Sequence, residues 1–471
     1  MPTGKRPGYR VPDTATSLRG ARVTVVGLGI EGVDLVRFLC GEGAEVTVSD
    51  ARAAEALSVS LAAIEGCDAR LSLGANRPKA AAGADLLFVS QGVPSSNPVL
   101  VEAETRGVPI SSMLGLFLTR CPAPVTGITG SAGKTTTTRL VAAMLDAAAV
   151  EHVVGGNIGV GLLSLLEDIR PATCVVAEIS HSQLDRLDTS PHLACVTNVS
   201  PNHLDRYAWS EYVDLKWRIL RHQGDDDIAV LNADDEITRG FATRAPGRVV
   251  TTSTMGPTAG DGASLEGGVI VRTRRGERTE VMRRHQVALR GDHNVENVLS
   301  AVAVASELGV EPEVMGRAVS EFTGVEHRLE PVATVGGVEY VNDSIAVSPT
   351  RTLAGLRACA TAVVLLLGGR DRRLPKQELG AEAARRCRAV VTFGEAGPLY
   401  AAAVRDAPGG AAVELREVST VCEAVEVASK LARPGDVVLF SPAGASFDAY
   451  PNFEERGAAF RAAVHRLEGG V

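Results

Sequence analysis

A glycine-rich segment that ends in a lysine and a run of threonines has the residue types of a phosphate-binding loop. It reads GITGSAGKTTTTRL (residues 127–140) and lies between an apolar run and a helical pattern. Backbone N–H groups in such a loop surround phosphate oxygens, Lys134 can neutralise the outer phosphate charge, and the Thr135 hydroxyl can ligate Mg²⁺. Ile128 departs from the strict motif, which has a glycine there. The residues expected to bind the phosphates are Gly130, Ser131, Gly133, Lys134, Thr135 and Thr136.

A second glycine pattern, GLGIEG at residues 27–32, follows an apolar run near the start of the chain. Asp50 ends the next apolar run, 18 residues after Gly32. This arrangement is typical of dinucleotide-binding turns, in which the glycines admit a pyrophosphate and the acid bonds a ribose hydroxyl. A tight strand–helix turn without a ligand is the alternative. An NAD-dependent oxidoreductase therefore stays open as a hypothesis, and the chain has two candidate phosphate sites.

Candidate metal ligands follow the phosphate loop. Glu178 ends the apolar run CVVAEIS, and His203 lies in NVSPNHLDRY. An acid at the carboxyl end of a strand beside a phosphate loop is suited to Mg²⁺. Taken singly, Glu178 could be a strand-end cap and His203 an ordinary loop histidine. Lys216, in DLKWRIL, would by itself be interpreted as a solvated helix lysine.

The elements that must position these residues alternate between short β-branched runs and Ala/Leu-rich helical stretches. This alternation predicts an α/β protein with parallel sheets covered by helices. Pro, Gly and polar residues interrupt the pattern near 119–124 and 322–331. We therefore expect three domains, at residues 1–120, 121–325 and 326–471. The predicted strands lie in ARVTVVGLG, AEVTVSD, ADLLFVSQG, APVTGITG, CVVAEIS, ACVTNVS, DIAVLNADD, TAVVLLLGG, RAVVTFGE and DVVLFSPAG, with small antiparallel strands within 252–284.

Composition excludes several classes of function. The 471 residues carry a net charge of -8 with scattered Lys and Arg, which gives no basic stripe for nucleic acid. The eight cysteines have no metal-ligand spacing, and no run of about 18 apolar residues occurs. We expect a cytoplasmic protein, a monomer, that neither binds nucleic acid nor inserts into a membrane.

Taken together in order, many short motifs resemble the Mur ligase family of peptidoglycan precursor synthesis, and within it the members that add glutamate. The resemblance runs from about residue 20 to the end of the chain. The motifs that carry it are GITGSAGKTTTT, GGNIG, VAEIS, TNVSPNHLDRY, the lysine of DLKWRIL, GDHNVENVLSAVAVA, EHRLE, VNDS and SPAGASFDAYPNFEERGAAF.

The resemblance implies an ATP-dependent ligase that joins the carboxyl group of UDP-N-acetylmuramoyl-L-alanine to the amino group of glutamate through an acyl phosphate. It also implies a Rossmann-like N-terminal domain for the UDP part, a central P-loop ATPase-type domain with a parallel sheet for ATP, and a Rossmann-like C-terminal domain for the amino acid. The two phosphate sites would then serve two nucleotides. The cofactor would be Mg²⁺, with ATP as co-substrate.

Residue roles follow from the same resemblance. Catalytic roles would belong to Lys134, Glu178, His203 and Lys216. The Mg²⁺ ligands would be Thr135, Glu178, His203 and Lys216, the last after carbamylation of its amine. ATP would also contact Asn294, Asn297, Arg328 and Asp343. The UDP substrate would contact Gly29, Ile30, Asp50, Arg52, Ser90, Gly92 and Asn157.

The acceptor site departs from the family pattern. Ile345 and Val347 stand where D-glutamate ligases have a lysine and a threonine, and Arg372 is offered in place of another lysine. Ser446 and Phe453 retain groups that would face the acceptor. Losing a cation and a hydroxyl would leave an acidic ligand unpaired. We therefore expect L-glutamate as acceptor, with the standard D-glutamate reaction as the alternative.

Two further departures lie nearer the phosphate loop. Gln91 replaces the proline of a Ser-Pro-Gly turn, and His181 and Ser182 stand within a segment that reads SSFQL in the family. If such losses meant a decayed enzyme, the chain would be a noncatalytic nucleotide-binding module. That hypothesis also stays open, although Lys134 and Glu178 are present.

Overall fold

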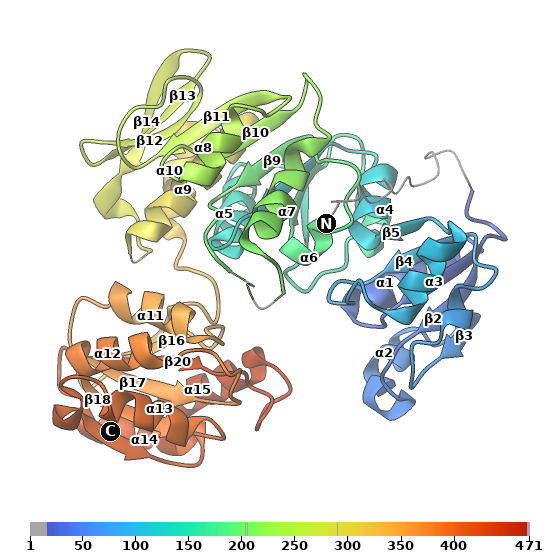
Figure 1. The fold of residues 1–471 in the computed structure, drawn as a ribbon. Helices are drawn as coiled ribbons and strands as arrows, with labels where there is room; N and C mark the ends of the chain where they lie inside the picture. The colour runs from blue at the N-terminus through green and yellow to red at the C-terminus, as the bar shows by residue number, and fades with distance from the viewer. Residues whose placement is uncertain (1–16, 203, 205, 290, 469–471) are drawn as a thin grey trace. The chain divides into compact units, whose positions relative to one another are not determined.

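A computed structural model describes residues 17–202, 204, 206–289 and 291–468. The chain forms two compact units, the first containing residues up to 288 together with 292–322, and the second containing 289–291 and the residues from 323 onward. Within the described residues the strands build three sheets (Figure 1). Among those same residues, no helix is both long enough and apolar enough to cross a bilayer.

The first sheet of unit 1 is parallel throughout and has the order β3-β2-β1-β4-β5. Its central strand is apolar on both faces because helices cover both sides, so Val23, Val25 and Val26 are all buried. The strands are β1 (Arg22–Val26), β2 (Glu45–Ser49), β3 (Ala69–Ser72), β4 (Leu86–Val89) and β5 (Ile110–Ser112). The helices are α1 (Ile30–Gly41), α2 (Ser58–Ala63), α3 (Pro98–Arg106) and α4 (Met113–Arg120).

The second sheet of unit 1 has the order β14-β13-β12-β11-β10-β9-β6-β8-β7. Strands β6 to β12 run parallel, and β13 and β14 extend the edge as antiparallel strands. The strands are β6 (Val125–Thr129), β7 (His152–Gly156), β8 (Cys174–Glu178), β9 (Leu193–Val196), β10 (Ile228–Asn232), β11 (Arg248–Ser253), β12 (Gly262–Glu266), β13 (Val269–Arg274) and β14 (Glu277–Arg283). The helices are α5 (Lys134–Ala147), α6 (His181–Leu184), α7 (Trp209–Arg221), α8 (Glu236–Ala242), α9 (Asp292–Glu307) and α10 (Pro312–Glu321).

Unit 2 contains the third sheet, with the order β15-β16-β20-β17-β18-β19, in which only β15 is antiparallel to its neighbour. Separate apolar clusters cover its two faces. The strands are β15 (Glu330–Val335), β16 (Val338–Asn342), β17 (Val363–Gly368), β18 (Cys387–Phe393), β19 (Glu414–Glu417) and β20 (Val437–Ala443). The helices are α11 (Pro349–Ala358), α12 (Gln377–Arg386), α13 (Gly397–Arg405), α14 (Val421–Leu431) and α15 (Phe453–Glu468).

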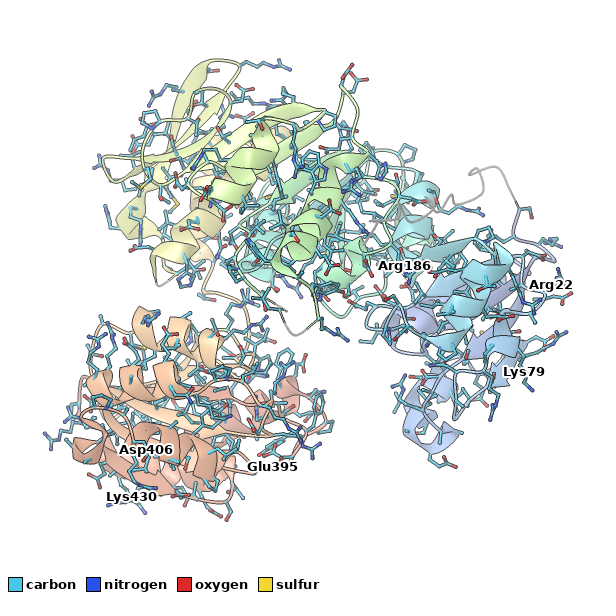
Figure 2. The ribbon with its side chains drawn as sticks, viewed as in Figure 1. Arg22, Lys79, Arg186, Glu395, Asp406 and Lys430 are labelled. Carbon is cyan, nitrogen blue, oxygen red and sulfur yellow. The ribbon has the colours of Figure 1, made fainter. Side chains whose placement is uncertain are left out.

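The predicted fold class is confirmed. Each of the ten predicted apolar runs contains a strand, and parallel pairing dominates all three sheets. Within 252–284 the prediction of antiparallel strands holds for β13 and β14, whereas β12 pairs with β11 in parallel. Charged side chains of both signs, such as Arg22, Lys79, Asp406 and Lys430, lie exposed on the two units (Figure 2), as the mixed composition predicts.

Candidate functional site

The phosphate loop connects β6 to α5 in the predicted strand–loop–helix arrangement. Gly133 caps the helix with a φ of 82°, a left-handed conformation that favours glycine, and Lys134 is the first helical residue. The loop is held from outside, because the hydroxyl of Ser131 donates to the carbonyl of Ser200 (2.9 Å) and the amide of Ala132 donates to the Asn198 side chain (3.0 Å). Its backbone is therefore preorganised for an anion at the start of a fourteen-residue helix.

Two lysine side chains converge on one carbonyl oxygen of this loop. The Nζ atoms of Lys134 and Lys216 each lie 2.9 Å from the carbonyl oxygen of Gly130, and Lys216 Nζ also lies 3.1 Å from the Thr129 hydroxyl. Lys216 is 1% exposed, so it is not the solvated helix lysine of the simplest interpretation. Burial, and then the nearby charge of Lys134, lower its pKa well below the ordinary value, although Glu178 acts in the opposite direction.

Glu178 ends β8 beside the phosphate loop and is almost wholly buried. Its Oε1 accepts a hydrogen bond from the side-chain amide of Asn157 (2.8 Å), whereas Oε2 has no hydrogen-bond partner among the described residues. A buried carboxylate oxygen without a donor suits a divalent cation. His203, the predicted histidine ligand, lies outside the described residues.

The predicted metal set is consistent with this donor chemistry. Within the described residues no group of three His, Cys, Asp or Glu side chains could hold a metal ion. The predicted ligand set does not require such a group of three, because it includes the hydroxyl of Thr135 and a modified Lys216. The orphaned oxygen of Glu178 is the observation that fits Mg²⁺ here.

Helix α9 brings the predicted adenine-side residues to the phosphate loop. Asn294 and Asn297 are buried on its first turns and are joined by a hydrogen bond of 2.9 Å. A Cβ atom at Gly133 would clash with Asn297 Oδ1. Only glycine therefore permits this approach, and the structure places both asparagines beside the loop that the sequence predicts to bind phosphates.

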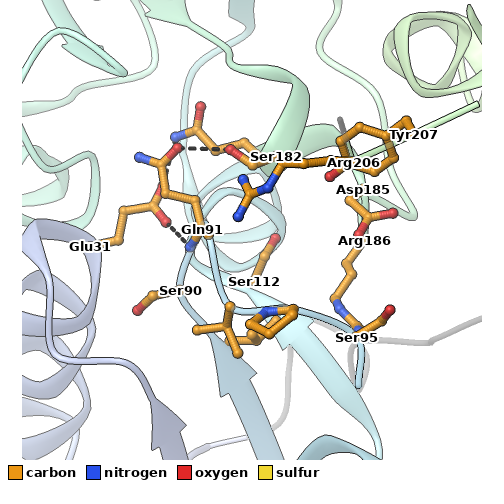
Figure 3. Close-up of a pocket in the computed structure, with 15 residues that line it drawn as sticks. Glu31, Ser90, Gln91, Ser95, Ser112, Ser182, Asp185, Arg186, Arg206 and Tyr207 are labelled. Carbon is orange, nitrogen blue, oxygen red and sulfur yellow. Dashed lines mark hydrogen bonds between the residues drawn. The ribbon is translucent and has the colours of Figure 1, made fainter. Parts of the chain in front are cut away.

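A pocket of about 270 Å³ in unit 1 lies between the turn after β4 and helix α6 (Figure 3). It brings together Ser90 and Gly92, two of the predicted UDP-substrate residues, with several side chains that the sequence reasoning missed. Those additional residues include Glu31, Gln183, Arg186, Arg206 and Tyr207. Arg186 pairs with Glu104 (3.6 Å), whereas the exposed Arg206 gives the pocket a cationic group that can bind an anionic ligand.

Hydrogen bonds across this pocket join the turn, α1 and α6. The backbone amide of Gln91 donates to Glu31 Oε2 (2.9 Å), and the side-chain amide of Gln183 donates to Glu31 Oε1 (2.7 Å). Gln91 Oε1 accepts from the hydroxyl of Ser182 (3.1 Å), as Figure 3 shows, and also from the hydroxyl of Ser180 (3.0 Å). Burial raises the pKa of Glu31, although both amide donors act against this shift. Two departures from the family pattern, Gln91 and Ser182, therefore contact each other directly.

Near the glycine turn after β1, the predicted ribose-binding acid Asp50 is already hydrogen-bonded to other residues of the protein. Asp50 Oδ2 accepts the amide of Leu28 (2.8 Å), and both Asp50 oxygens accept from Arg52. Burial acts to raise the pKa of Asp50, but these hydrogen bonds outweigh it and hold the pKa below the ordinary value. Gly29 caps α1, and Ile30 is 66% exposed. Asp50 and Arg52 thus form a preformed ion pair that is hydrogen-bonded to the glycine turn.

In unit 2 the remaining predicted residues lie after the carboxyl end of a strand, at the start of a helix or, for Arg328, just before a strand. Asp343 follows β16, where its side chain accepts from the Ser441 hydroxyl (2.7 Å) and the Leu329 amide (3.2 Å). Burial raises its pKa to about 6. Arg328 lies just before β15, in a turn closed by its amide and the carbonyl of Val325 (3.0 Å). Phe453 begins α15 and meets His327 edge-on, with ring centroids 5.8 Å apart.

The predicted acceptor residues lie on three loops of this same edge. Arg372 Nη1 lies 3.4 Å from the carbonyl oxygen of Val347, and Arg351 Nη1 lies 3.3 Å from that of Ile345. Ser446, after β20, is buried. The loop that lacks the family's lysine and threonine is therefore contacted by two guanidinium groups from neighbouring segments. Sequence reasoning anticipated only Arg372.

Family models match three consecutive parts of the chain. A Mur ligase MurD-like N-terminal domain matches residues 21–112, a Mur ligase middle domain matches 128–305, and a Mur ligase glutamate ligase domain matches 327–444. Together these matches span most of the chain. The phosphate loop, Glu178 and Lys216 all lie within the middle-domain match.

Similar proteins extend over nearly the whole chain. A protein of Symbiobacterium thermophilum named UDP-N-acetylmuramoylalanine--D-glutamate ligase is 42% identical and covers 95% of this chain and 98% of its own length. One of the same name from Acetivibrio thermocellus is 39% identical and covers 98% and 99%. The crystal structure of UDP-N-acetylmuramate-alanine ligase from Thermotoga maritima superposes with a TM-score of 0.59 at 20% identity, covering 96% of this chain and all of its own, which shows a shared fold.

Proposed function

The chain belongs to the Mur ligase family of ATP-dependent peptide ligases, and we propose that it joins D-glutamate to UDP-N-acetylmuramoyl-L-alanine. The observation that carries this proposal is the full-length similarity to two proteins named for that reaction. These relatives favour the D-glutamate alternative and give no support to our expectation of L-glutamate. Membership in a ligase family also sets aside the oxidoreductase and the noncatalytic module.

The reaction requires activation of a carboxylate, because an ionised carboxylate does not acylate an amine in water. Transfer of the γ-phosphoryl group of ATP would give an acyl phosphate, and attack by the acceptor's amine would then release phosphate. Phosphoryl transfer depends mainly on positioning and on charge stabilisation. The loop amides and the Lys134 ammonium supply donors and positive charge where the phosphates would lie.

We propose that Glu178, Thr135, His203 and carbamylated Lys216 hold Mg²⁺. When bound, the ion would neutralise phosphate charge during transfer. Only a neutral amine adds CO₂, and the burial of Lys216 beside Lys134 disfavours its ammonium form. Carbamylation would turn Lys216 from a potential cation into an anion beside Lys134, and so would remove the repulsion between two like charges. Incorporation of ¹³C-labelled bicarbonate, read by NMR in the wild-type protein and absent in Lys216→Met, tests this modification.

The pocket of unit 1 is the site that we propose for the muramoyl part of the substrate. Ser90 and Gly92 line it, and its exposed Arg206 suits an anionic sugar nucleotide. Asn157, bonded to Glu178, would lie between this substrate and the metal site. Asp50 is already bonded to the Leu28 amide and to Arg52, so the uracil-side contacts would come from the Asp50–Arg52 pair together with Ile30.

Arg372 is the group that we propose to replace the missing lysine for the acceptor's carboxylate. Its guanidinium already contacts the backbone carbonyl of Val347, the residue that stands in place of the family's threonine. A cation restored at this loop removes the reason for expecting a different acceptor. The D enantiomer, in agreement with the relatives' names, then needs no change of chirality in the site.

The test is phosphate release from ATP, Mg²⁺ and UDP-N-acetylmuramoyl-L-alanine with each glutamate enantiomer, with the product weighed by mass spectrometry. Turnover with D-glutamate is the expected result, and turnover with L-glutamate alone would refute the proposal. Arg372→Ala should raise the KM for D-glutamate about 10-fold or more, because a charged hydrogen-bonding partner is lost. The exposed neighbour Arg373→Ala is the matched control and should leave that KM unchanged.

A further inference from the structure

The largest fully buried side chain of the described residues is an arginine that lies in the motif SPAGASFDAYPNFEERGAAF but to which the sequence analysis gave no role. Arg456 lies on the first turn of α15, three residues after Phe453, and is 0% exposed. Among the described residues, its Nε has no hydrogen-bond partner. A buried, charged side chain of this kind is expensive to keep unless it has a specific task.

The guanidinium lies where three loops of unit 2 meet. Nη1 donates to the carbonyl oxygen of Gly444 (3.0 Å), and Nη2 donates to that of Ser344 (3.1 Å). A Cβ atom on Gly369 would lie 2.6 Å from Nη1. These loops follow β20, β16 and β17, which are adjacent in the sheet in the order β16-β20-β17. Arg456 therefore joins the loops at the carboxyl edge of three parallel strands, the edge where such sheets bind ligands.

Both peptide groups that Arg456 contacts are fixed on their other side as well. The peptide after Ser344 donates its N–H, from Ile345, to the carbonyl of His327 (3.1 Å). The peptide after Gly444 donates its N–H, from Ala445, to the carbonyl of Arg370 (3.0 Å). With the guanidinium on the carbonyl oxygens, neither peptide can rotate without breaking hydrogen bonds on both sides.

The loops that meet at Arg456 carry the residues proposed for the acceptor. Ile345 and Val347 lie on the loop after β16, Arg372 on the loop after β17, and Ser446 on the loop after β20. Arg456 is not one of these acceptor residues, and its guanidinium has no exposed surface with which to touch a ligand. Its influence on an acceptor would therefore pass through the loops.

We propose that Arg456 is a positioning residue for the acceptor amino acid, setting the mutual placement of the three loops that form its binding site. The inference rests on the proposed ligase function and adds a residue to it. A planar guanidinium with two parallel N–H donors can bond two carbonyls at once in fixed geometry, which the single ammonium of a lysine cannot reproduce. Burial lowers the pKa of Arg456 to about 10, with Asp448 acting against the shift, so the group stays charged at neutral pH.

The test is steady-state ligase kinetics of Arg456→Lys and Arg456→Gln, assayed at a temperature at which far-UV circular dichroism shows each variant folded. For both variants we expect the KM for D-glutamate to rise about 10-fold or more, since displacements of about 1 Å have large effects on bound geometry. The KM values for ATP and for UDP-N-acetylmuramoyl-L-alanine should stay close to those of the wild type.

Arg388→Met is the matched control. It removes a guanidinium that pairs with Asp436 at the opposite, amino-terminal edge of the same sheet, so it tests general destabilisation of unit 2. An unchanged KM for glutamate in either folded Arg456 variant, or an equal rise of all three KM values, would overturn the inference. A wild-type protein that forms no product would instead overturn the proposed function, so the two failures are distinguishable.

Discussion

At the scale of single residues, the phosphate loop brings two amine side chains together before any nucleotide is present. Two amine side chains approach the carbonyl of Gly130, and one of them is fully buried. Such an arrangement is unfavourable for two cations in a low-dielectric setting and becomes favourable when an anion lies next to them. The loop thus gains most from ligands that carry several negative charges.

Lys134→Ala tests this charge directly. We expect ligation to slow about 100-fold or more, because a cation that stabilises the transferring phosphoryl group is lost. Phosphate release measures the rate, and calorimetric binding of UDP, which is proposed to bind elsewhere in unit 1, should be unaffected. Arg139→Ala, an exposed cation on the same helix, is the control. Full activity of Lys134→Ala would contradict the proposed use of the loop.

Asp343 should make unit 2 less stable as the pH rises. Burial raises its pKa from 3.8 to about 6, so the folded state binds the proton more tightly than the unfolded chain. The sign follows from linkage: stability is lost as the pH rises from about 4 to about 6 and stays lower above that. Asp343→Asn removes this dependence. Between pH 4 and pH 8, the unfolding free energy of the Asn variant should therefore rise relative to that of the wild type, by roughly 3 kcal/mol at most.

The measurement is denaturant unfolding followed by far-UV circular dichroism between pH 4 and pH 8. Asp371→Asn is a control of opposite sign, because the hydrogen bond and charge of Lys376 lower the pKa of Asp371. Because its pKa lies below the ordinary 3.8, the destabilisation of that variant should stay constant between pH 4 and pH 8 and be lost only at lower pH. A pH-independent difference between Asp343→Asn and the wild type would show that the carboxyl group titrates in its ordinary range.

At the scale of elements, local pattern identifies the strands and the phosphate loop but not the contacts between distant segments. The buried strands β1, β6 and β17 are apolar in sequence and were predicted. Short or polar edge strands such as β3 and β19 were not, because their exposed residues give no apolar run. Strand β16, which leads to Asp343, was also missed, since the charged Glu339 interrupts it.

The same limit applies to the candidate site. The spacing of 130–135 encodes its own loop, so those residues were found. Gln91 and Ser182, by contrast, lie 91 residues apart and meet only because two sheets of unit 1 place the turn after β4 beside α6. Arg456 is likewise recognisable only once three strand ends lie together. Contacts set by tertiary structure leave no spacing signal within a single segment.

A double-mutant cycle tests the contact between the turn and α6. Gln91→Ala and Ser182→Ala should each destabilise unit 1, and the two effects should couple by roughly 0.5–1.5 kcal/mol, since they share one hydrogen bond. Urea unfolding followed by tryptophan fluorescence measures the coupling. Pairing Gln91→Ala with Thr105→Ala, whose hydroxyl bonds only within α3, is the control and should be additive. Additivity of the first pair would show that the hydrogen bond contributes nothing measurable.

At the scale of the whole molecule, the chain has two units whose apolar clusters share no residues. Units with separate cores can unfold in separate transitions. Both tryptophans, Trp209 and Trp217, belong to unit 1, and unit 2 has none. Tryptophan fluorescence therefore reports on unit 1, whereas far-UV circular dichroism reports on both units.

This division predicts that UDP stabilises one unit selectively. Every residue proposed to contact the UDP substrate lies in unit 1. Saturating UDP should therefore raise the denaturant midpoint of the transition seen by fluorescence, and it should leave unchanged the midpoint of the unit 2 transition seen by circular dichroism. At a UDP concentration about 100 times its Kd, the stabilisation should approach about 2.7 kcal/mol. Arg52→Ala, which removes one member of the Asp50–Arg52 pair, should reduce the shift, whereas Arg388→Met in unit 2 should not. An equal shift of both transitions would mean that UDP contacts both units or that the units unfold together, and either result would contradict the assignment of this ligand to unit 1 alone.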